Sequence, residues 1–355
     1  MKAKKDPRTG KWMIQYRYTN WQGKRKKSTK RGFATKKDAE KWLREFLQIK
    51  ALDMNMSFND FADLYLEDMS HRLREHTMIN KRYIIDLKIR PYFGEKKMNE
   101  IKAVDVRAWQ NELMKQDYAA TYLKTVNIQL SAIFNYTSKY YDLPNNPCRK
   151  AGSMGKSRAE EMNYWTKEEF QAFVDTLMDK QMSYMLFTTL YWTGMRIGEL
   201  LALTTADVDL DEKMIHVTKS YQRLHCEDVI TDPKTPKAKR DISIPDFLAE
   251  DYADYFNSIY DLQEDDRLFP VTKYYIEHEM QRGIKLSGVK KIRVHDLRHS
   301  HVSMLISMGF QPLEIADRLG HERVQTTMDT YAHLYPNTRT QIAEKLQEEH
   351  EENQE

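Results

Sequence analysis

Four short segments in the C-terminal half of the chain carry side chains that could do chemistry on a phosphate ester. TGMRIGEL places Arg196 at an expected helix start, and HDLRHSH places His295 and Arg298 three residues apart, on one face of a helical turn. LGHERV places His321 directly after a glycine, and TMDTYAHL supplies Tyr331. Taken singly, such residues are more typical of a surface ion pair, a buried histidine and a packed aromatic ring.

Together these side chains form a set that could break and rejoin a phosphodiester. A guanidinium group pairs with phosphate oxygens in a bidentate way and stays charged, and imidazoles exchange protons near neutral pH. A deprotonated tyrosine hydroxyl can attack phosphorus and hold the strand covalently. Because this link conserves the energy of the phosphodiester, no cofactor is expected, and the sequence has neither a Walker loop nor an evident carboxylate cluster for a metal.

The composition predicts a cytoplasmic protein of two or three domains. The chain has 355 residues, of which 41% are hydrophobic and 31% charged. No apolar run approaches the ~20 residues of a membrane span, and the basic N-terminus lacks the apolar segment of a secretory signal. Cys148 and Cys226 suggest neither a disulfide framework nor a zinc site.

The first 50 residues hold 17 Lys and Arg against 4 Asp and Glu, which predicts a surface for a polyphosphate. We expect residues 1–52 to form two strands and a helix, since KWMIQYRYT alternates and KRKKSTKRGF reads as a second, basic strand. The helix would cover one face of the sheet. The other face would then present Gln15, Arg17, Lys26 and Lys30 to a DNA groove, the alternative being a merely solubilising charged surface.

Residues 57–145 are predicted to form a small all-α domain, with Lys81 and Lys124 as candidate DNA contacts. LPNNPCRKAGSMGKSRAEEMN, residues 143–163, is rich in Pro, Gly and Asn and is predicted to be an interdomain linker. A mainly α-helical domain with a small β-sheet should occupy residues 160–345, and residues 346–355 form an acidic tail. The first helix of the domain at residues 160–345 should begin at a capping box made by Thr166 and Glu169.

As an ordered set, TGMRIGEL, HDLRH, LGH and a tyrosine ten residues beyond that histidine resemble the tyrosine recombinases, also called the phage integrase family. The resemblance covers nearly the whole chain. The first domain is similar to the arm-binding domain of lambda-like and conjugative-transposon integrases, the second to their SAM-like core-binding domain, and the third to their catalytic domain. It implies a recombinase that integrates and excises a mobile element through a 3′-phosphotyrosyl intermediate and a Holliday junction.

The resemblance also implies a role for each residue of the set. Arg196 and Arg298 would clamp the scissile phosphate, and His321 would donate to a non-bridging oxygen. His295 would act as acid and base for the proton of the nucleophile, and Tyr331 would be that nucleophile.

Two further roles follow from the same resemblance. Glu199 would support the site without reacting, and a hairpin lysine would protonate the departing 5′ oxygen. Lys234, in the PKT step, matches that lysine best, while Lys237 and Lys239 stay open. His299 and His301, beside the HDLRH motif, are interpreted as structural, and Tyr335 as a packing residue.

The expected partners are double-stranded DNA with core and arm sequences, a homotetramer on that DNA, an excisionase and a host DNA-bending protein. Ile342 and Leu346 form a modest apolar stripe that could dock the tail on an adjacent protomer. A Xer-like dimer-resolving recombinase is an alternative, which the basic first domain disfavours. A type IB topoisomerase and a non-catalytic DNA-binding regulator are also less favoured, the latter because every expected reactive residue is present.

Overall fold

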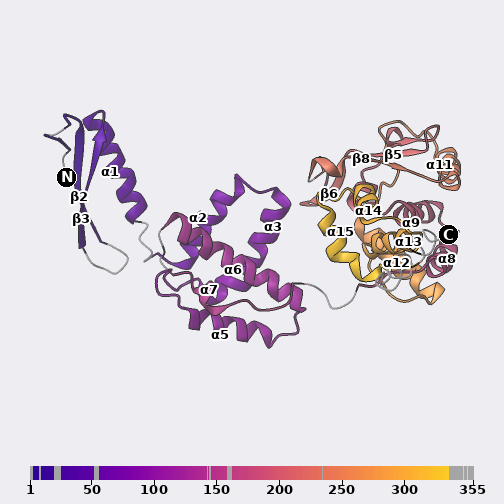
Figure 1. Cartoon of the computed structure of the whole chain (residues 1–355), viewed down its shortest axis with the longest axis horizontal. Coiled ribbons are helices and arrows are strands. Elements are labelled where there is room, and N and C mark those ends of the chain that lie inside the picture. Colours follow the sequence, from indigo (N-terminus) through magenta and orange to yellow (C-terminus); the bar gives the residue numbers. More distant parts are fainter. Residues whose placement is uncertain are drawn as a thin grey trace. The chain divides into compact units, whose positions relative to one another are not determined.

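The computed structural model describes residues 3–7, 9–19, 25–51, 56–141, 143, 145–157, 162–233, 235–335, 347 and 350, without the side chains of residues 17–19, 25–26 and 44–51. The chain divides into two compact units, Met1–Glu160 and Glu161–Glu355. In chain order, a sheet with one helix is followed by a group of helices and by a larger part with helices and small sheets (Figure 1). Among the described helices, none is both long and apolar enough to cross a membrane.

The N-terminal domain is an antiparallel sheet with one helix against it. Its elements, in chain order, are β1 (Lys4–Lys5), β2 (Trp12–Thr19), β3 (Arg25–Phe33) and α1 (Lys36–Ala51), and the strands have the order β1-β2-β3. Ile14 and Tyr16 of β2 are buried in one small cluster with Ala39 and Leu43 of α1. The alternation of β2 therefore directs one face of the sheet toward the helix, as the sequence predicted.

The strand register changes which basic residues face outward. Lys30 lies opposite Ile14, and directly opposite residues of an antiparallel pair share a face. Its ammonium stands 5.9 Å from the centre of the Trp42 ring of α1. The expectation that Lys30 points away from the helix is therefore wrong, whereas Gln15 is exposed on the opposite face, across from Thr29. The side chains of Arg17 and Lys26 lie outside the described residues.

The second domain is all-α around an aromatic core. Its elements are α2 (Phe58–Ser70), α3 (Glu75–Ile84), a π-helical turn (Ile85–Ile89), α4 (Arg90–Phe93), α5 (Ala103–Met114), α6 (Ala120–Tyr140) and α7 (Pro147–Ala151). Phe58, Phe93, Trp109 and Phe134 pack together at its centre. The all-α character of this domain matches the sequence prediction, and α7 lies in the segment that was predicted to be a linker.

The segment that contains α7 is part of this domain and not a linker. Pro147 occupies the first turn of α7, and the Asn146 side chain caps it by accepting from the Cys148 backbone N–H at 2.8 Å. Cys148 and Met154 are buried in the domain core. The helical domain therefore continues past the predicted end at residue 145. The segment is rich in Pro and Gly, but its Cys148 and Met154 side chains pack in the domain core.

Lys81 lies inside the second domain. Its Nζ donates to Tyr65 Oη at 2.9 Å and to Gln129 Oε1 at 2.8 Å, and its burial lowers its pKa. An ammonium group in this place does not suit the predicted contact with DNA. The other candidate, Lys124, is half-buried and donates to Ser153 Oγ at 2.8 Å.

The third domain is mainly α-helical. Its helices are α8 (Lys167–Val174), α9 (Gln181–Thr193), α10 (Ile197–Leu200), α11 (Asp246–Ser258), α12 (Lys273–Ser287), α13 (Asp296–Ser307), α14 (Pro312–Leu319) and α15 (Val324–Tyr331). Its strands are β4 (Val208–Asp209), β5 (Met214–Val217) and β8 (Arg240–Ser243) in one sheet, with β6 (Ser220–Leu224) and β7 (Glu227–Thr231) as a hairpin. The predicted capping box is confirmed, since the side chains of Thr166 and Glu169 each accept from the other's backbone N–H.

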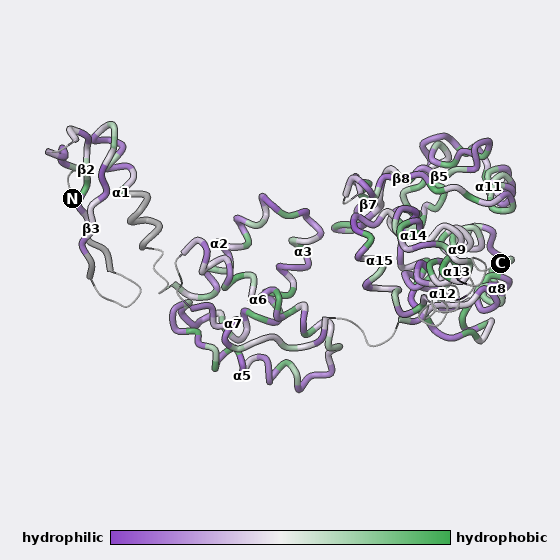
Figure 2. The backbone as a smooth tube through the Cα atoms, viewed as in Figure 1, coloured by the Kyte–Doolittle hydropathy of each residue, from purple (hydrophilic) through white to green (hydrophobic). Residues whose placement is uncertain are grey.

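The core of the third domain gathers around α9. Helices α8, α11 and α13 contact α9, whose residues are buried on nearly all sides, and hydrophobic segments meet there (Figure 2). A smaller, separate cluster joins α13 to α14 and α15. Ile342 and Leu346, which were predicted to dock the tail, lie outside the described residues.

Replacing Lys81 with alanine should lower the free energy of unfolding by about 2 kcal/mol, because the buried Tyr65 hydroxyl and Gln129 carbonyl lose their partner. Lys124→Ala should change it by less than about 0.5 kcal/mol. Urea denaturation of the full-length chain, followed by circular dichroism, compares the two variants. Equal stability of both would contradict the interior position of Lys81.

Candidate active site

Arg298 is the buried centre of the site. Its side chain lies in the first turn of α13, where Nη1 donates to the Gly194 carbonyl at 2.6 Å and Nη2 to the Leu319 carbonyl at 2.8 Å. These carbonyls lie at the C-terminal ends of α9 and α14, where backbone oxygens lack helical partners and the helix dipole is negative. Burial, with Arg196 nearby, lowers the pKa of Arg298 to about 9, so the guanidinium is charged at neutral pH.

Two glycines shape the turns that Arg298 joins. Gly194 ends α9 and Gly320 ends α14, both with a left-handed backbone, at φ values of 64° and 65°. A Cβ atom on Gly194 would lie 2.5 Å from Cδ2 of His301. These turns therefore need glycine, and each sends the next polar residues, Arg196 and His321, toward the same region.

Arg196 is held by a buried carboxylate. It begins α10, where its Nη1 donates to Glu199 Oε1 at 2.6 Å and its backbone N–H to Glu199 Oε2 at 2.9 Å. Burial alone would raise the pKa of Glu199, but Arg240 and Arg196 hold that pKa below its ordinary value. Glu199 thus lies beside Arg196 as an ionised partner, the place at which the sequence predicted a supporting residue.

Arg240 is a member of the site that the sequence interpretation missed. From the start of β8, its Nη2 donates to Glu199 Oε2 at 3.0 Å and its Nε to the Arg318 carbonyl at 2.8 Å. Its side chain is only 6% exposed. The sequence signal was weak, because Arg240 follows several other basic residues in KTPKAKR.

His321 lies near the arginines in the turn between α14 and α15, and His295 directly precedes α13. His321 is half-buried, and its Nδ1 lies 2.8 Å from the hydroxyl of the fully buried Thr327. Desolvation, followed by the charge of Arg298, lowers the pKa of His321 to about 4, so the ring is neutral at pH 7. When Thr327 donates to Nδ1, Nε2 carries the proton and can donate to a ligand oxygen. His295 is exposed at the start of α13. Desolvation by the surrounding residues, followed by the charge of Arg298, lowers its pKa.

Tyr331 ends α15 with its side chain buried, at 2% exposure. Its hydroxyl lies 2.6 Å from Nδ1 of His299. Burial raises the pKa of Tyr331 to about 12 and lowers that of His299 to about 4. His299 was interpreted as structural, with His295 serving the phenol, yet the ring in contact with the phenol is that of His299.

Two of the three candidate lysines line a polar hollow of about 560 Å³. Lys237, Lys239, Arg240 and His321 are among the residues that line it. Lys237 is exposed, and Lys239 forms an ion pair with Asp232 at 2.9 Å. Lys234, the preferred candidate, lies outside the described residues. Within the described part of the chain, no group of His, Cys, Asp and Glu side chains could hold a metal ion.

Comparison with known proteins identifies the family. Three family models match in order along the chain: an Arm DNA-binding domain at residues 3–48, a phage integrase N-terminal SAM-like domain at 57–114, and the Phage integrase family at 163–338. The ICEBs1 integrase of Bacillus subtilis (strain 168) is 31% identical over 334 residues, which span 88% of this chain and 90% of that protein. The chain belongs to the phage integrase family.

Solved structures confirm the predicted tyrosine recombinase fold. The Tn1549 transposon integrase in complex with a circular intermediate DNA has a TM-score of 0.69 at 18% identity, covering 81% of this chain and 98% of that one. A lambda integrase tetramer bound to a Holliday junction has a TM-score of 0.58 at 15% identity, covering 90% and 93%. This phage integrase is thus a tyrosine recombinase, the enzyme class that the sequence predicted.

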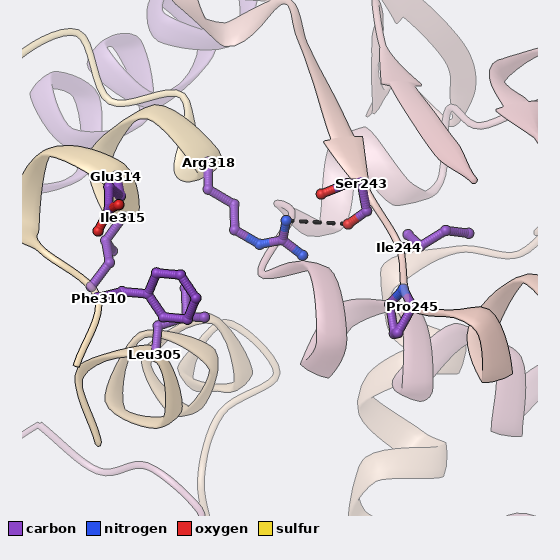
Figure 3. Close-up of a pocket in the computed structure, with 8 residues that line it drawn as sticks. All are labelled: Ser243, Ile244, Pro245, Leu305, Phe310, Glu314, Ile315 and Arg318. Carbon is purple, nitrogen blue, oxygen red and sulfur yellow. Dashed lines mark hydrogen bonds between the residues drawn. The ribbon is translucent and has the colours of Figure 1, made fainter. Parts of the chain in front are cut away.

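A second, more apolar pocket of this integrase adjoins the polar hollow. Figure 3 shows its lining, with Leu305 and Phe310 on one side, Ile244 and Pro245 on the other, and Arg318 between them donating to the Ser243 carbonyl at 3.2 Å. Its volume is about 470 Å³. None of the predicted catalytic side chains lines it, so it lies beside the reaction centre and not at it.

The remaining candidates take structural positions in the integrase. His301 is buried, and its Nε2 accepts from Arg318 Nε at 3.1 Å. Tyr335 packs on the small cluster of α13–α15, and its hydroxyl is 3.4 Å from the Phe310 carbonyl. Both lie where the sequence interpretation expected packing residues.

Replacing Gly194 with alanine should disrupt the integrase site, and Gly288→Ala provides a matched control. Both glycines end helices with a left-handed backbone, so alanine brings a similar strain of about 1–2 kcal/mol. A Cβ at Gly288 meets nothing within 4 Å, whereas at Gly194 it meets His301. Gly194→Ala should therefore abolish DNA cleavage and lower the melting temperature further than Gly288→Ala. Equal effects of the two variants would mean that the turn at Gly194 tolerates the added atom.

Proposed function

We propose that this phage integrase integrates and excises a mobile element, with Tyr331 as the nucleophile that cuts its attachment-site DNA. The observation that carries the proposal is the charge balance around Arg298. Arg196, Arg240 and Arg298 gather near a single buried carboxylate, that of Glu199, which leaves an excess of positive charge. A phosphodiester anion supplies the charge that this centre lacks.

The arginines would bind the non-bridging oxygens of the scissile phosphate. Arg298 uses part of its fork on two carbonyls, and its other N–H groups remain for the phosphate. Arg196 and the Nε2–H of His321 would add donors. Electrostatic stabilisation of this kind typically contributes ~10²–10³ in rate for each donor.

Cleavage would exchange one phosphodiester for another. The Tyr331 oxygen forms a bond to phosphorus, and the bond from phosphorus to the 5′ oxygen breaks, which leaves a 3′-phosphotyrosyl link. The departing 5′ oxygen takes a proton from a lysine, for which we propose Lys234, with Lys237 and Lys239 of the same turn as alternatives. His295, beside the arginines, is the residue predicted to accept the proton of the Tyr331 hydroxyl.

The N-terminal domain would bind arm-type sites at a distance from the cut. The match to an Arm DNA-binding domain and the excess of 17 basic over 4 acidic residues in the first 50 support this assignment. Gln15 is an exposed candidate contact on the sheet face opposite α1, and Lys30 is exposed on the α1 side. The same match disfavours the Xer-like alternative, which has no need of an arm domain.

We further propose that four copies act together on DNA, because lambda integrase, of similar fold, forms a tetramer on a Holliday junction. An excisionase and a host DNA-bending protein would set the direction of the reaction. A cytoplasmic location follows from the proposed substrate, since the enzyme must meet the DNA of its host.

Covalent trapping on a nicked suicide substrate tests the nucleophile. The wild-type protein should form a covalent protein–DNA band on a denaturing gel, and Tyr331→Phe should form none because it lacks the attacking oxygen. Tyr335→Phe is the matched control and should retain the band. A band that survives in Tyr331→Phe would identify another nucleophile. Intact DNA binding without a wild-type band would favour the non-catalytic regulator.

Deletion of residues 1–52 tests the arm domain. The shortened protein should still cleave a short core site, while integration into DNA that carries arm sites is lost. Arm-site binding by the full-length protein should weaken steeply between low and moderate salt, since phosphate neutralisation releases counterions. Loss of core-site cleavage together with integration would contradict a modular role for this domain.

A further inference from the structure

The histidine that touches the nucleophile has no role in the mechanism described so far. Nδ1 of His299 lies 2.6 Å from the Tyr331 hydroxyl, and the two rings stand 5.5 Å apart between their centres. His299 lies on α13, one residue after Arg298, so the same helical turn holds both the phosphate-binding group and this ring. The contact therefore joins the nucleophile to the phosphate site through a rigid element.

The protonation states allow the Tyr331 phenol to be the donor in this hydrogen bond. The phenol is neutral at pH 7, since burial raises the pKa of Tyr331, and the imidazole is neutral, since burial lowers that of His299. A neutral phenol carries a proton to donate, and Nδ1 of a neutral ring can accept it when Nε2 bears the ring proton. In this tautomer the phenol proton points at Nδ1 of His299.

A buried carboxylate stands behind the imidazole. Oδ1 of Asp296 lies 4.0 Å from Nε2 of His299, and its side chain is 4% exposed. Arg293 anchors that carboxylate, with Nη2 at 2.7 Å from Oδ1 and the backbone N–H at 2.8 Å from Oδ2. The distance to His299 is too long for a hydrogen bond, so Asp296 acts through its charge, which favours the protonated ring. Carboxylate, imidazole and hydroxyl follow one another as in other activated nucleophiles.

His295 is less well placed to serve the phenol. Its ring centre lies 5.5 Å from that of His299, its side chain is exposed, and the described hydrogen bond of the Tyr331 hydroxyl is with His299. A general base needs hydrogen-bond reach of the proton that it removes. His299 meets this requirement, because its Nδ1 lies 2.6 Å from the Tyr331 hydroxyl.

We propose that His299 is the general base for Tyr331 and that the charge of Asp296 favours protonation of the His299 ring, an inference that rests on the proposed function. During cleavage the phenol proton passes to Nδ1 as the phenol oxygen bonds to phosphorus and the 5′ oxygen leaves with a proton from the lysine. During rejoining, the 5′ hydroxyl attacks phosphorus and returns its proton to that lysine, and the imidazolium returns its own to the phenol oxygen. Protons and bonds balance in both directions.

DNA binding would strengthen this base. The groups that face His299 are His295, Arg293, Arg298 and Asp296, of which only the last favours the protonated ring. A phosphodiester anion held by Arg196 and Arg298 would offset part of the positive charge near His299. The imidazole would then accept a proton more readily with substrate bound than without it.

The test is single-turnover cleavage by the full-length protein on two nicked substrates. One carries the ordinary phosphodiester, and the other carries sulfur in place of the bridging 5′ oxygen, so that its leaving group needs no proton. His299→Gln should cleave both substrates ~10²–10⁴-fold more slowly than wild type, as expected for a lost general base. Lys234→Ala should be slow on the oxygen substrate and recover on the sulfur one. Recovery of His299→Gln on sulfur would overturn the proposal.

The pH dependence separates a lost base from a disturbed fold. Without the base, cleavage by His299→Gln should rise about tenfold per pH unit above pH 7, as the phenol ionises in water, while the wild-type rate stays flat. Asp296→Asn should slow cleavage and move the acidic limb of the profile to lower pH, because a negative charge that favours the protonated ring is gone. A slow His299→Gln whose rate does not respond to pH would indicate only a structural role and overturn the proposal.

Three controls keep the outcomes distinct. His278→Gln, at an exposed histidine on α12, should cleave like wild type. His295→Gln, run in parallel, identifies the base as His295 if it alone shows the rising pH profile. Wild-type trapping through Tyr331 tests the proposed function itself, so a wild type that traps normally beside a His299→Gln within threefold of its rate would overturn this inference alone. Gel-shift binding of each variant checks that DNA still docks.

Discussion

The site depends on one buried cation that binds the ends of two helices. Removing the Arg298 guanidinium from water is costly, and a buried charge persists only when hydrogen bonds and opposite charge compensate it. Here the compensation comes from the carbonyls of Gly194 and Leu319, at the negative ends of α9 and α14. The same two bonds fix the turns that present Arg196 and His321, so the arginine organises the site that it also serves.

In this arrangement the site holds more positive than negative charge. Glu199 is shared between Arg196 and Arg240, and no carboxylate accepts from Arg298 among the described hydrogen bonds. The excess is visible in the neighbours, since nearby arginines contribute to the lowered pKa of both His295 and His321. A bound phosphodiester would therefore reduce the repulsion among these positive charges. Its binding would also be favoured because folding has already removed much of the water around the arginines.

Motif spacing is a local property, so the sequence could predict that Arg196, Arg298 and His321 gather in one region. TGMRIGEL, HDLRH and LGH each lie at a helix end, where a glycine or the first turn fixes the direction of the next side chains. The sequence prediction failed for residues whose positions depend on contacts between segments far apart in the chain. Arg240 could not be separated from its basic neighbours without knowing that β8 lies beside α14, and the side of the sheet on which Lys30 lies depends on a register shift between Trp12 and Met13. The role of His299 depends on a contact across 32 residues.

The burial of Tyr331 explains why its phenol would need a base. A phenol with a pKa near 12 is almost wholly protonated at neutral pH, so attack on phosphorus needs a group that removes the proton. The ring belongs to a small cluster with Val302, Ile306, Ile315 and Leu319, separate from the main core of the domain. Few buried contacts hold such a cluster, and segments of this kind open at lower free energy than the core. The proposed nucleophile is thus kept away from water in a small cluster at the end of α15, while α13 carries the proposed base and the proposed phosphate-binding arginine.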